Sequence, residues 1–178
     1  LLPGNMAPDR QPRLTFVFSG QGGQWYGMGL ELMKQEPTFS QAIERIDLAI
    51  QEHFGWSLKN ALLAEQPESR LDEIDVVQPA IFAIQVALAG LLREWGIIPD
   101  AVIGHSMGEV AAAHVAGILS LEDAIQVICL RSQLLKDLPS PGCMLATELT
   151  PVQAKDFLKG YEKDISIAGI NGPGAQVP

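Results

Sequence analysis

Residues 101–109 read AVIGHSMGE, and the rest of the chain is interpreted around this segment. Its apolar first half predicts a short strand that enters a tight turn, and a helix is expected over Val110–Val115. Between them lies the pattern Gly-x-Ser-x-Gly, which is typical of a nucleophile elbow with Ser106 at its tip. Gly104 and Gly108 have no Cβ, so strand and helix can approach closely while the serine takes a strained backbone position. The hydroxyl is then expected to project into a cleft beside a helix N-terminus.

The same residues allow a simpler interpretation. Ser106-x-x-Glu109 is also a capping box, in which the serine only begins a helix. The flanking glycines and the preceding apolar strand favour the elbow. No nearby histidine is suited to assist the serine: His114 lies two helical turns away, about 12 Å, and His105 is expected to point away from the strained turn.

The bulk composition excludes several classes of function. The chain has 178 residues, a hydrophobic content of 47% and a formal net charge of −9, so it predicts a globular domain without a basic nucleic-acid surface. The longest apolar run, residues 79–92, is interrupted by Gln85 and is too short to span a membrane. Cys129 and Cys143 form neither a disulfide framework nor a metal site, which indicates a cytoplasmic protein. The chain begins with Leu and without a signal peptide, so we expect it to be cut from a longer protein.

Before the elbow, a first strand is predicted over Leu14–Phe18. It enters the glycine-rich segment 19–25, SGQGGQW, whose backbone N–H groups can approach a ligand but which matches neither a Rossmann nor a Walker motif. Gln78 precedes Pro79, which is expected at the first helical position; Gln78 could cap that helix or face the cleft. Helices are predicted over Met28–Lys34, Thr38–Phe54, Ser57–Leu63, Ala80–Trp95 (the buried helix) and Leu121–Leu138, the last capped at Ser120.

Arg131 occupies an unexpected place on the last of these helices. At 100° per residue it falls inside the apolar arc formed by Leu121, Ala124, Ile125, Val127, Ile128, Leu134, Leu135 and Leu138. An uncompensated buried charge costs about 3–5 kcal/mol, so this arginine needs a carboxylate. Helical geometry alone leaves open an internal ion pair, a side chain that reaches solvent along the core edge, and a bound substrate.

The pattern divides the chain into three parts. Residues 1–13 are proline-rich and predict a linker, and residues 14–141 predict an α/β large subdomain. Residues 142–178 contain a strand over Cys143–Thr147, a helix over Thr150–Leu158 and a strand over Ile165–Ile170, which is typical of the first half of a small α+β subdomain.

Four motifs now converge: FSGQGGQ at residues 18–24, QPA at 78–80, GHSMGE at 104–109, and Arg131. As a set, over residues 14–173, they resemble the malonyl-CoA:acyl-carrier-protein transacylase family, in particular the acyltransferase domains of modular polyketide synthases and type I fatty acid synthases. The resemblance implies an α/β hydrolase-like parallel-sheet large subdomain with an inserted ferredoxin-like small subdomain, of which this chain holds the incomplete first half.

The resemblance also implies a chemistry. Ser106 would take a malonyl-type acyl group from acyl-CoA as an ester and pass it to the phosphopantetheine thiol of an acyl carrier protein. The backbone N–H groups of Gln21 and Met107 would form the oxyanion hole. Arg131 would bind the acyl carboxylate, which favours the substrate among the alternatives above. Gln78 and His105 are expected to be further substrate-binding residues.

No cofactor or metal is expected in this domain, the phosphopantetheine belongs to the partner, and a ketosynthase domain is the expected neighbour. Two departures qualify the resemblance: Ser19 replaces a common proline, and the family's general-base histidine would lie beyond residue 178. Two alternatives follow, a serine hydrolase or thioesterase on the same elbow, and an inactive fragment of the transferase.

Overall fold

The computed structural model describes residues 13–139, 142–172 and 175–177, and the fold is α/β. Residues 1–12 of the predicted linker lie outside this range. The chain forms two compact units, unit 1 (Leu1–Asp137) and unit 2 (Leu138–Pro178). The division falls after residue 137 rather than after residue 141 because the last helix of unit 1 ends at Lys136, with Asp137 as its C-cap.

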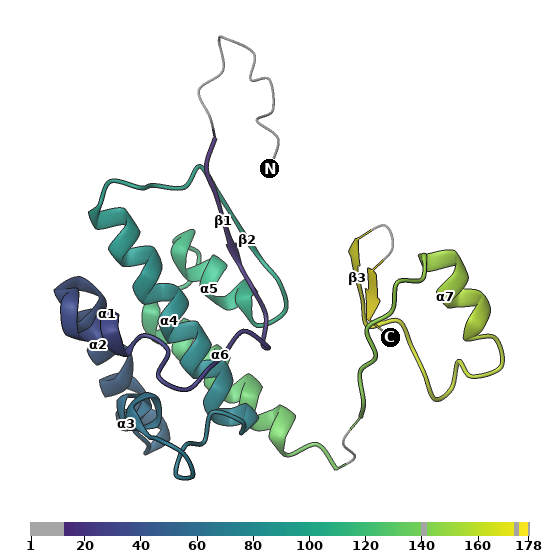
Figure 1. Ribbon diagram of the computed structural model, residues 1–178, viewed down its shortest axis with the longest axis horizontal. Helices are drawn as coiled ribbons and strands as arrows, with labels where there is room; N and C mark the ends of the chain where they lie inside the picture. The colour runs from purple at the N-terminus through teal and green to yellow at the C-terminus, as the bar shows by residue number, and fades with distance from the viewer. Residues whose placement is uncertain (1–12, 140–141, 173–174, 178) are drawn as a thin grey trace, which may run out of the picture. The chain divides into compact units, whose positions relative to one another are not determined.

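Unit 1 contains a parallel pair of strands that are distant in sequence. Strand β1 (Thr15–Phe18) lies beside β2 (Ala101–Gly104), with Phe18 opposite Gly104 (Figure 1). Because the strands are parallel and in register, their C-terminal ends lie side by side. The glycine-rich segment after β1 therefore meets the elbow after β2.

The described part of unit 1 also contains six helices, and α4 is the central one. They are α1 (Leu30–Gln35), α2 (Pro37–Phe54), α3 (Leu58–Leu63), α4 (Ile74–Glu94), α5 (Gly108–Val115) and α6 (Leu121–Lys136). Helix α4 packs against α2, α3, α5 and α6 (Figure 1). The amphipathic face predicted for α2 is confirmed, since Phe39, Ile43, Ile46 and Ile50 are all buried.

Helix α4 begins six residues earlier than predicted. It starts at Ile74, so Pro79 lies inside the helix and not at its first position. A proline there removes one backbone hydrogen bond, but Val76 and Val77 before it are fully packed in the core. Burying two valines stabilises this first turn by about 1.5–3 kcal/mol each, which offsets the lost bond.

The full length of α4 also changes the membrane argument. At 21 residues it is long and apolar enough to cross a bilayer, unlike the 14-residue run considered above. However, 67% of its most apolar window is buried inside the protein, so we assign α4 to the core of unit 1.

The buried stripe of α6 is narrower than predicted and is rotated. Its buried residues are Ala124, Ile125, Ile128, Cys129 and Ser132. Val127 and Leu134, which were expected in the apolar arc, are 43% and 70% exposed. The helix packs with one i, i+3, i+4, i+7 stripe, and Ser132 satisfies its buried hydroxyl by donating to the Cys129 carbonyl at 2.8 Å.

The described part of unit 2 contains one helix and one antiparallel pair of strands. Helix α7 (Pro151–Phe157) lies within the predicted range 150–158, and a complete capping box between Thr150 and Gln153 begins it. Strand β3 (Gly169–Gly172) pairs antiparallel with β4 (Ala175–Val177). The strand predicted over Cys143–Thr147 is wrong apart from an isolated bridge at Thr147, and the one predicted from Ile165 begins only at Gly169. In the described part of unit 2, extended backbone becomes a strand only where a partner strand pairs with it.

Candidate active site

The elbow has the backbone that its sequence predicts. Ser106 has φ of 53°, the one positive φ of a non-glycine residue in the described chain. A Cβ on Gly104 would overlap the Glu109 backbone, and one on Gly108 would overlap the Phe18 carbonyl. The two glycines therefore let α5 lie directly against the ends of both strands.

The capping-box interpretation of this serine is wrong. Helix α5 has Met107 as its N-cap, and no side chain caps it. The Ser106 side chain is exposed, and Arg131 donates to its hydroxyl. The Met107 side chain is buried in the core. The turn thus presents Ser106 outward and buries the next residue, Met107, in the core.

Arg131 lies between Ser106 and Gln78. Its Nη2 donates to Ser106 Oγ at 3.2 Å, and its Nη1 donates to Gln78 Oε1 at 2.5 Å. The ion pairs found among the described residues do not include Arg131, so its partners there are uncharged. The internal ion pair considered from the helical wheel is therefore wrong. The side chain is half-buried, and its positive charge is available to an anionic ligand beside the serine.

Gln78 connects the arginine to the glycine-rich segment. It is buried at 4% exposure, and its Nε2 donates to Gln21 Oε1 at 3.2 Å. Because α4 begins at Ile74, Gln78 lies inside the helix and does not cap it. Of the two possibilities left open by the sequence, the structure thus supports the one in which Gln78 faces the site.

The segment after β1 lies against the elbow. A Cβ on Gly20 would lie 3.2 Å from His105 Nδ1 and 3.6 Å from the Ser106 Cβ. The backbone N–H of His105 donates to the Phe18 carbonyl at 2.9 Å, which continues the pairing of the strands by one residue. Gln21, the next residue after Gly20, is exposed at this edge. The structure therefore brings together all six site residues predicted from the sequence.

One residue at this edge was not predicted. Gln85 Nε2 donates to the Ser19 carbonyl at 2.9 Å, so α4 contacts the segment at a second point. The signal was present in the sequence: Gln85 interrupts the apolar run and follows Gln78 by seven residues, which places both amides on one helix face.

The other histidines lie elsewhere in unit 1. His114 Nδ1 contacts the Leu119 carbonyl at 3.1 Å, and His53 is exposed near the end of α2. Neither is placed at Ser106.

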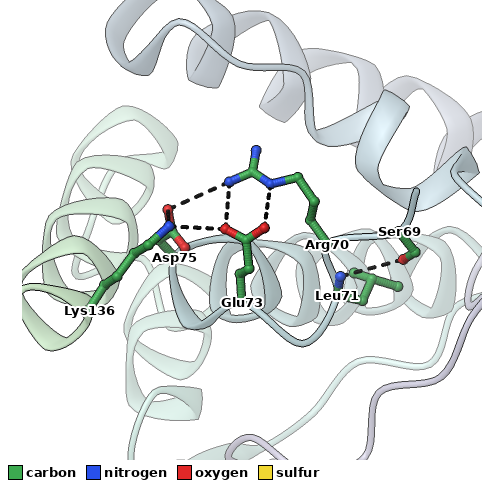
Figure 2. Close-up of polar contacts among 6 residues, drawn as sticks. All are labelled: Ser69, Arg70, Leu71, Glu73, Asp75 and Lys136. Atoms are coloured by element: carbon green, nitrogen blue, oxygen red, sulfur yellow. Dashed lines mark hydrogen bonds and ion pairs between the residues drawn. The ribbon is translucent and has the colours of Figure 1, made fainter. Parts of the chain in front are cut away.

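A cluster of charges lies where α4 begins and α6 ends (Figure 2). Glu73 accepts hydrogen bonds from Arg70 and Lys136, which lower its pKa to about 2. The bond from Arg70 has the larger effect. Hydrogen bonds to Asp75 and Glu73 raise the pKa of Lys136. Deeper in α6, burial raises the pKa of the Cys129 thiol to about 12.

The fold and site define an α/β protein with a nucleophile-elbow serine beside an arginine. Comparison with known proteins is more specific: the family model "Acyl transferase domain" matches residues 15–177, and the chain belongs to this family. The predicted resemblance is confirmed.

Its relatives include synthases that are much longer than this chain. The chain is 48% identical over 165 residues to mycoketide-CoA synthase of Mycobacterium tuberculosis, covering 93% of this chain and 4% of that protein. It is 43% identical to erythronolide synthase EryA3 of Saccharopolyspora erythraea, covering 93% of this chain and 5% of that protein. It therefore spans a small part of these relatives.

Solved structures agree. The acyltransferase domain from the second module of the salinomycin polyketide synthase is 42% identical with a TM-score of 0.86, over 94% of this chain and 39% of that one. The loading acyltransferase of the avermectin synthase is 39% identical with a TM-score of 0.84, over 92% of this chain and 52% of that one.

Proposed function

We propose that this chain carries the nucleophile and the carboxylate-binding arginine of an acyltransferase, which loads a malonyl-type extender unit from acyl-CoA onto an acyl carrier protein. The observation that carries the proposal is the position of Arg131, which donates to Ser106 Oγ and to the Gln78 amide. A hydrolase of simple acyl esters has no need of a cation at this point, whereas a carboxylated acyl group does.

The acyl carboxylate would bind to the donors that Arg131 has left. Guanidinium has five N–H donors, and the structure shows two of them engaged, by Gln78 and Ser106. A carboxylate can accept from two others in the planar, bidentate geometry that arginine favours. Gln78 would orient the guanidinium by accepting its Nη1–H, so that Gln78 would act on the substrate indirectly, by positioning Arg131.

The reaction would then proceed in two balanced halves. Ser106 Oγ attacks the thioester carbonyl, the C–S bond breaks, and the serine proton is transferred to the departing CoA thiol through a general base. The thiol of the carrier's phosphopantetheine next attacks the ester, and the serine regains its proton as the acyl group leaves. We propose, from the family resemblance, that the base is a histidine outside residues 1–178, and that the domain itself binds no cofactor.

The negative charge that develops on the carbonyl oxygen would be stabilised by the backbone N–H groups of Gln21 and Met107. Removal of one such donor in an acyl-transfer enzyme costs about 2.7–4 kcal/mol. The contacts of Gln78 with Gln21 and of Gln85 with Ser19 support this proposal, because they fix the segment that carries the Gln21 peptide. His105, beside Gly20, would line the entry to the same edge.

The wider context is part of the same proposal. Unit 1 would belong to a hydrolase-like large subdomain, and unit 2 would begin a ferredoxin-like small one. Since relatives are multidomain polyketide synthases, a ketosynthase and a carrier domain would be neighbours in a cytoplasmic megasynthase. Acidic carriers would be repelled by a net charge of −9, so tethering rather than global charge would bring the carrier to Ser106.

The test is mass spectrometry of the intact protein after incubation with malonyl-CoA. We expect a malonyl ester that disappears in Ser106→Ala. In Arg131→Ala, loading from malonyl-CoA should fall about 100-fold, because hydrogen bonds to a charged group contribute about 1.5–3 kcal/mol each, while loading from acetyl-CoA should persist.

Two outcomes would contradict the proposal. Release of free malonate without a persistent adduct would identify a hydrolase or thioesterase. Failure of the intact protein to load any extender unit would identify an inactive member of the family.

A further inference from the structure

Four charged side chains join the N-terminus of α4 to the C-terminus of α6 (Figure 2). Lys136 Nζ lies 3.0 Å from Glu73 Oε2 and 2.9 Å from Asp75 Oδ2. Arg70 binds Glu73 through two parallel bonds, Nε to Oε1 at 2.7 Å and Nη2 to Oε2 at 2.8 Å. Its Nη2 also lies 3.9 Å from Asp75 Oδ2. We call these four residues the α4–α6 clamp.

The clamp uses the ends of both helices. Glu73 is the N-cap of α4 and Asp75 is in its first turn, where the helix dipole favours negative charge. Lys136 is the last residue of α6, where the dipole favours positive charge. Because the start of α4 contacts the end of α6, a step forward along α4 corresponds to a step backward along α6.

The same antiparallel pairing brings the site residues together. Gln78 follows Asp75 by three residues, about 4.5 Å of helix, and Arg131 precedes Lys136 by five residues, about 7.5 Å. The clamp therefore lies about one turn from the Gln78–Arg131 hydrogen bond, on the same helix pair.

Stability does not account for the clamp. The Lys136, Glu73 and Arg70 side chains are 44%, 38% and 48% exposed, and exposed ion pairs contribute little to folding. Asp75 is 19% exposed, and its Oδ1 is buried with no hydrogen-bond partner among the described residues. A carboxylate held in this way is unfavourable by itself, so a role in geometry explains it better.

We infer that Glu73, Asp75 and Lys136, supported by Arg70, are positioning residues that set the register of α6 on α4 and so hold Arg131 between Gln78 and Ser106. The cation of Arg131 must meet a carboxylate and leave the serine free to attack, and a displacement of about 1 Å in such a site can reduce a rate about 100-fold. The clamp ties α6 to α4 along the helix axes, which is the direction in which sliding would move Arg131 past Gln78. The kinetic part of this inference rests on the proposed function.

The test uses the intact protein and the variant Lys136→Met, which keeps the length of the side chain and removes its charge. Lys136→Arg is the rescue, since it restores the charge. Lys34→Met is the matched control, because Lys34 is an exposed lysine in the last turn of another helix, α1.

Two readouts are measured. The NMR signals of the Gln78 side-chain amide and the Arg131 Nε–H should shift in Lys136→Met, return in Lys136→Arg and stay unchanged in Lys34→Met. The KM for malonyl-CoA in Ser106 loading should rise about three- to tenfold in Lys136→Met, while loading from acetyl-CoA, which has no carboxylate for Arg131, should stay the same.

Unchanged Gln78 and Arg131 signals in Lys136→Met would overturn the inference. Equal losses with malonyl-CoA and acetyl-CoA would also overturn it, since they would indicate a general loss of structure. If the wild-type protein forms no ester at all, the proposed function is wrong, but the NMR signals still decide whether the clamp positions Arg131. Should Lys136→Met fail to fold, Glu73→Gln removes the ion pairs of Glu73 with Lys136 and Arg70 and is judged by the same signals.

Discussion

The two units of this chain bury their side chains to very different extents. In unit 1, α4 and the elements around it enclose one continuous core, in which Phe39, Phe82, Ile125 and Met107 are almost completely buried. In the described part of unit 2, Ala154 is the one buried side chain, and Met144 and Phe157 are 73% and 71% exposed.

The difference shows how each unit holds its shape. Unit 2 has a capped helix, a hairpin and an open, mainly apolar hollow of about 640 Å³ lined by residues such as Leu145, Phe157 and Ile165. Its helix is capped by neighbouring residues, and its strands pair with each other across a short separation in sequence. Unit 1 places Ser106, Arg131 and Gln78 to within hydrogen-bond distance because their helices and strands are fixed by a shared core. A site assembled from distant segments requires a shared core like that of unit 1.

The largest expected difference concerns the two cysteines. Cys129 is buried in unit 1 and its pKa is raised to about 12 by burial, whereas Cys143 is exposed in unit 2. Because the thiolate is the reactive form, we expect iodoacetamide at pH 8 to alkylate Cys129 about a thousandfold or more slowly than an ordinary exposed thiol. Peptide mass spectrometry over time measures both rates.

The control is alkylation in urea, where both cysteines should react at similar rates. Similar rates in the native protein would show that the core of unit 1 opens readily.

Truncating one phenylalanine in each unit tests the same contrast. Phe82→Ala should destabilise the protein by about 3–5 kcal/mol, because Phe82 is completely buried in α4. Phe157→Ala, at an exposed position, should change the free energy of unfolding by less than about 0.5 kcal/mol. Urea unfolding followed by circular dichroism measures both. A comparable loss in Phe157→Ala would mean that this side chain is covered in the intact protein.

Two glycines give a smaller effect. Gly108→Ala should cost about 1–3 kcal/mol, because its Cβ would meet the Phe18 and Ser19 carbonyl oxygens and force α5 away from the strands. Gly142→Ala in unit 2 is the matched variant: nothing lies within 4 Å of its Cβ, so stability should stay the same. Urea unfolding compares them, and a neutral Gly108→Ala would argue against tight packing at the elbow.

The smallest effect is a dependence on pH. The pKa of Glu73 falls from 4.5 to about 2 on folding, so the stability it contributes is complete above pH 4.5 and is lost as the pH falls from 4.5 towards 2. Glu73→Gln should therefore lower the thermal midpoint at pH 7 slightly, and the difference from wild type should shrink at pH 3. Glu162→Gln in unit 2 is the control. A difference that does not change with pH would mean that the ion pairs of Glu73 do not form in solution.

Prediction from the sequence was most accurate where the signal is local. The elbow at Gly104–Gly108, the Ser120 cap and the buried face of α2 were all predicted, because each depends on residues within a few positions of one another. Prediction was less accurate for the start of α4, where burial of the first turn outweighs the tendency of Pro79 to begin or break a helix. It was also less accurate for the strands of unit 2, because a strand forms there only where a partner strand pairs with it.

The candidate site residues followed from the sequence alone: a serine in a turn between two glycines, a glycine-rich segment and an arginine on a mostly apolar helix. The contacts that these residues make depend on the tertiary structure. Whether Arg131 meets a carboxylate or the Gln78 amide depends on the rotation and sliding of α6 against α4, and a rotation of one residue moves a side chain by 100°. Two other hydrogen bonds follow from the same packing. Gln85 donates to the Ser19 carbonyl over 66 residues of sequence, and Lys136 donates to Glu73 over 63 residues. Such contacts are set by the whole core, so no short stretch of sequence specifies them.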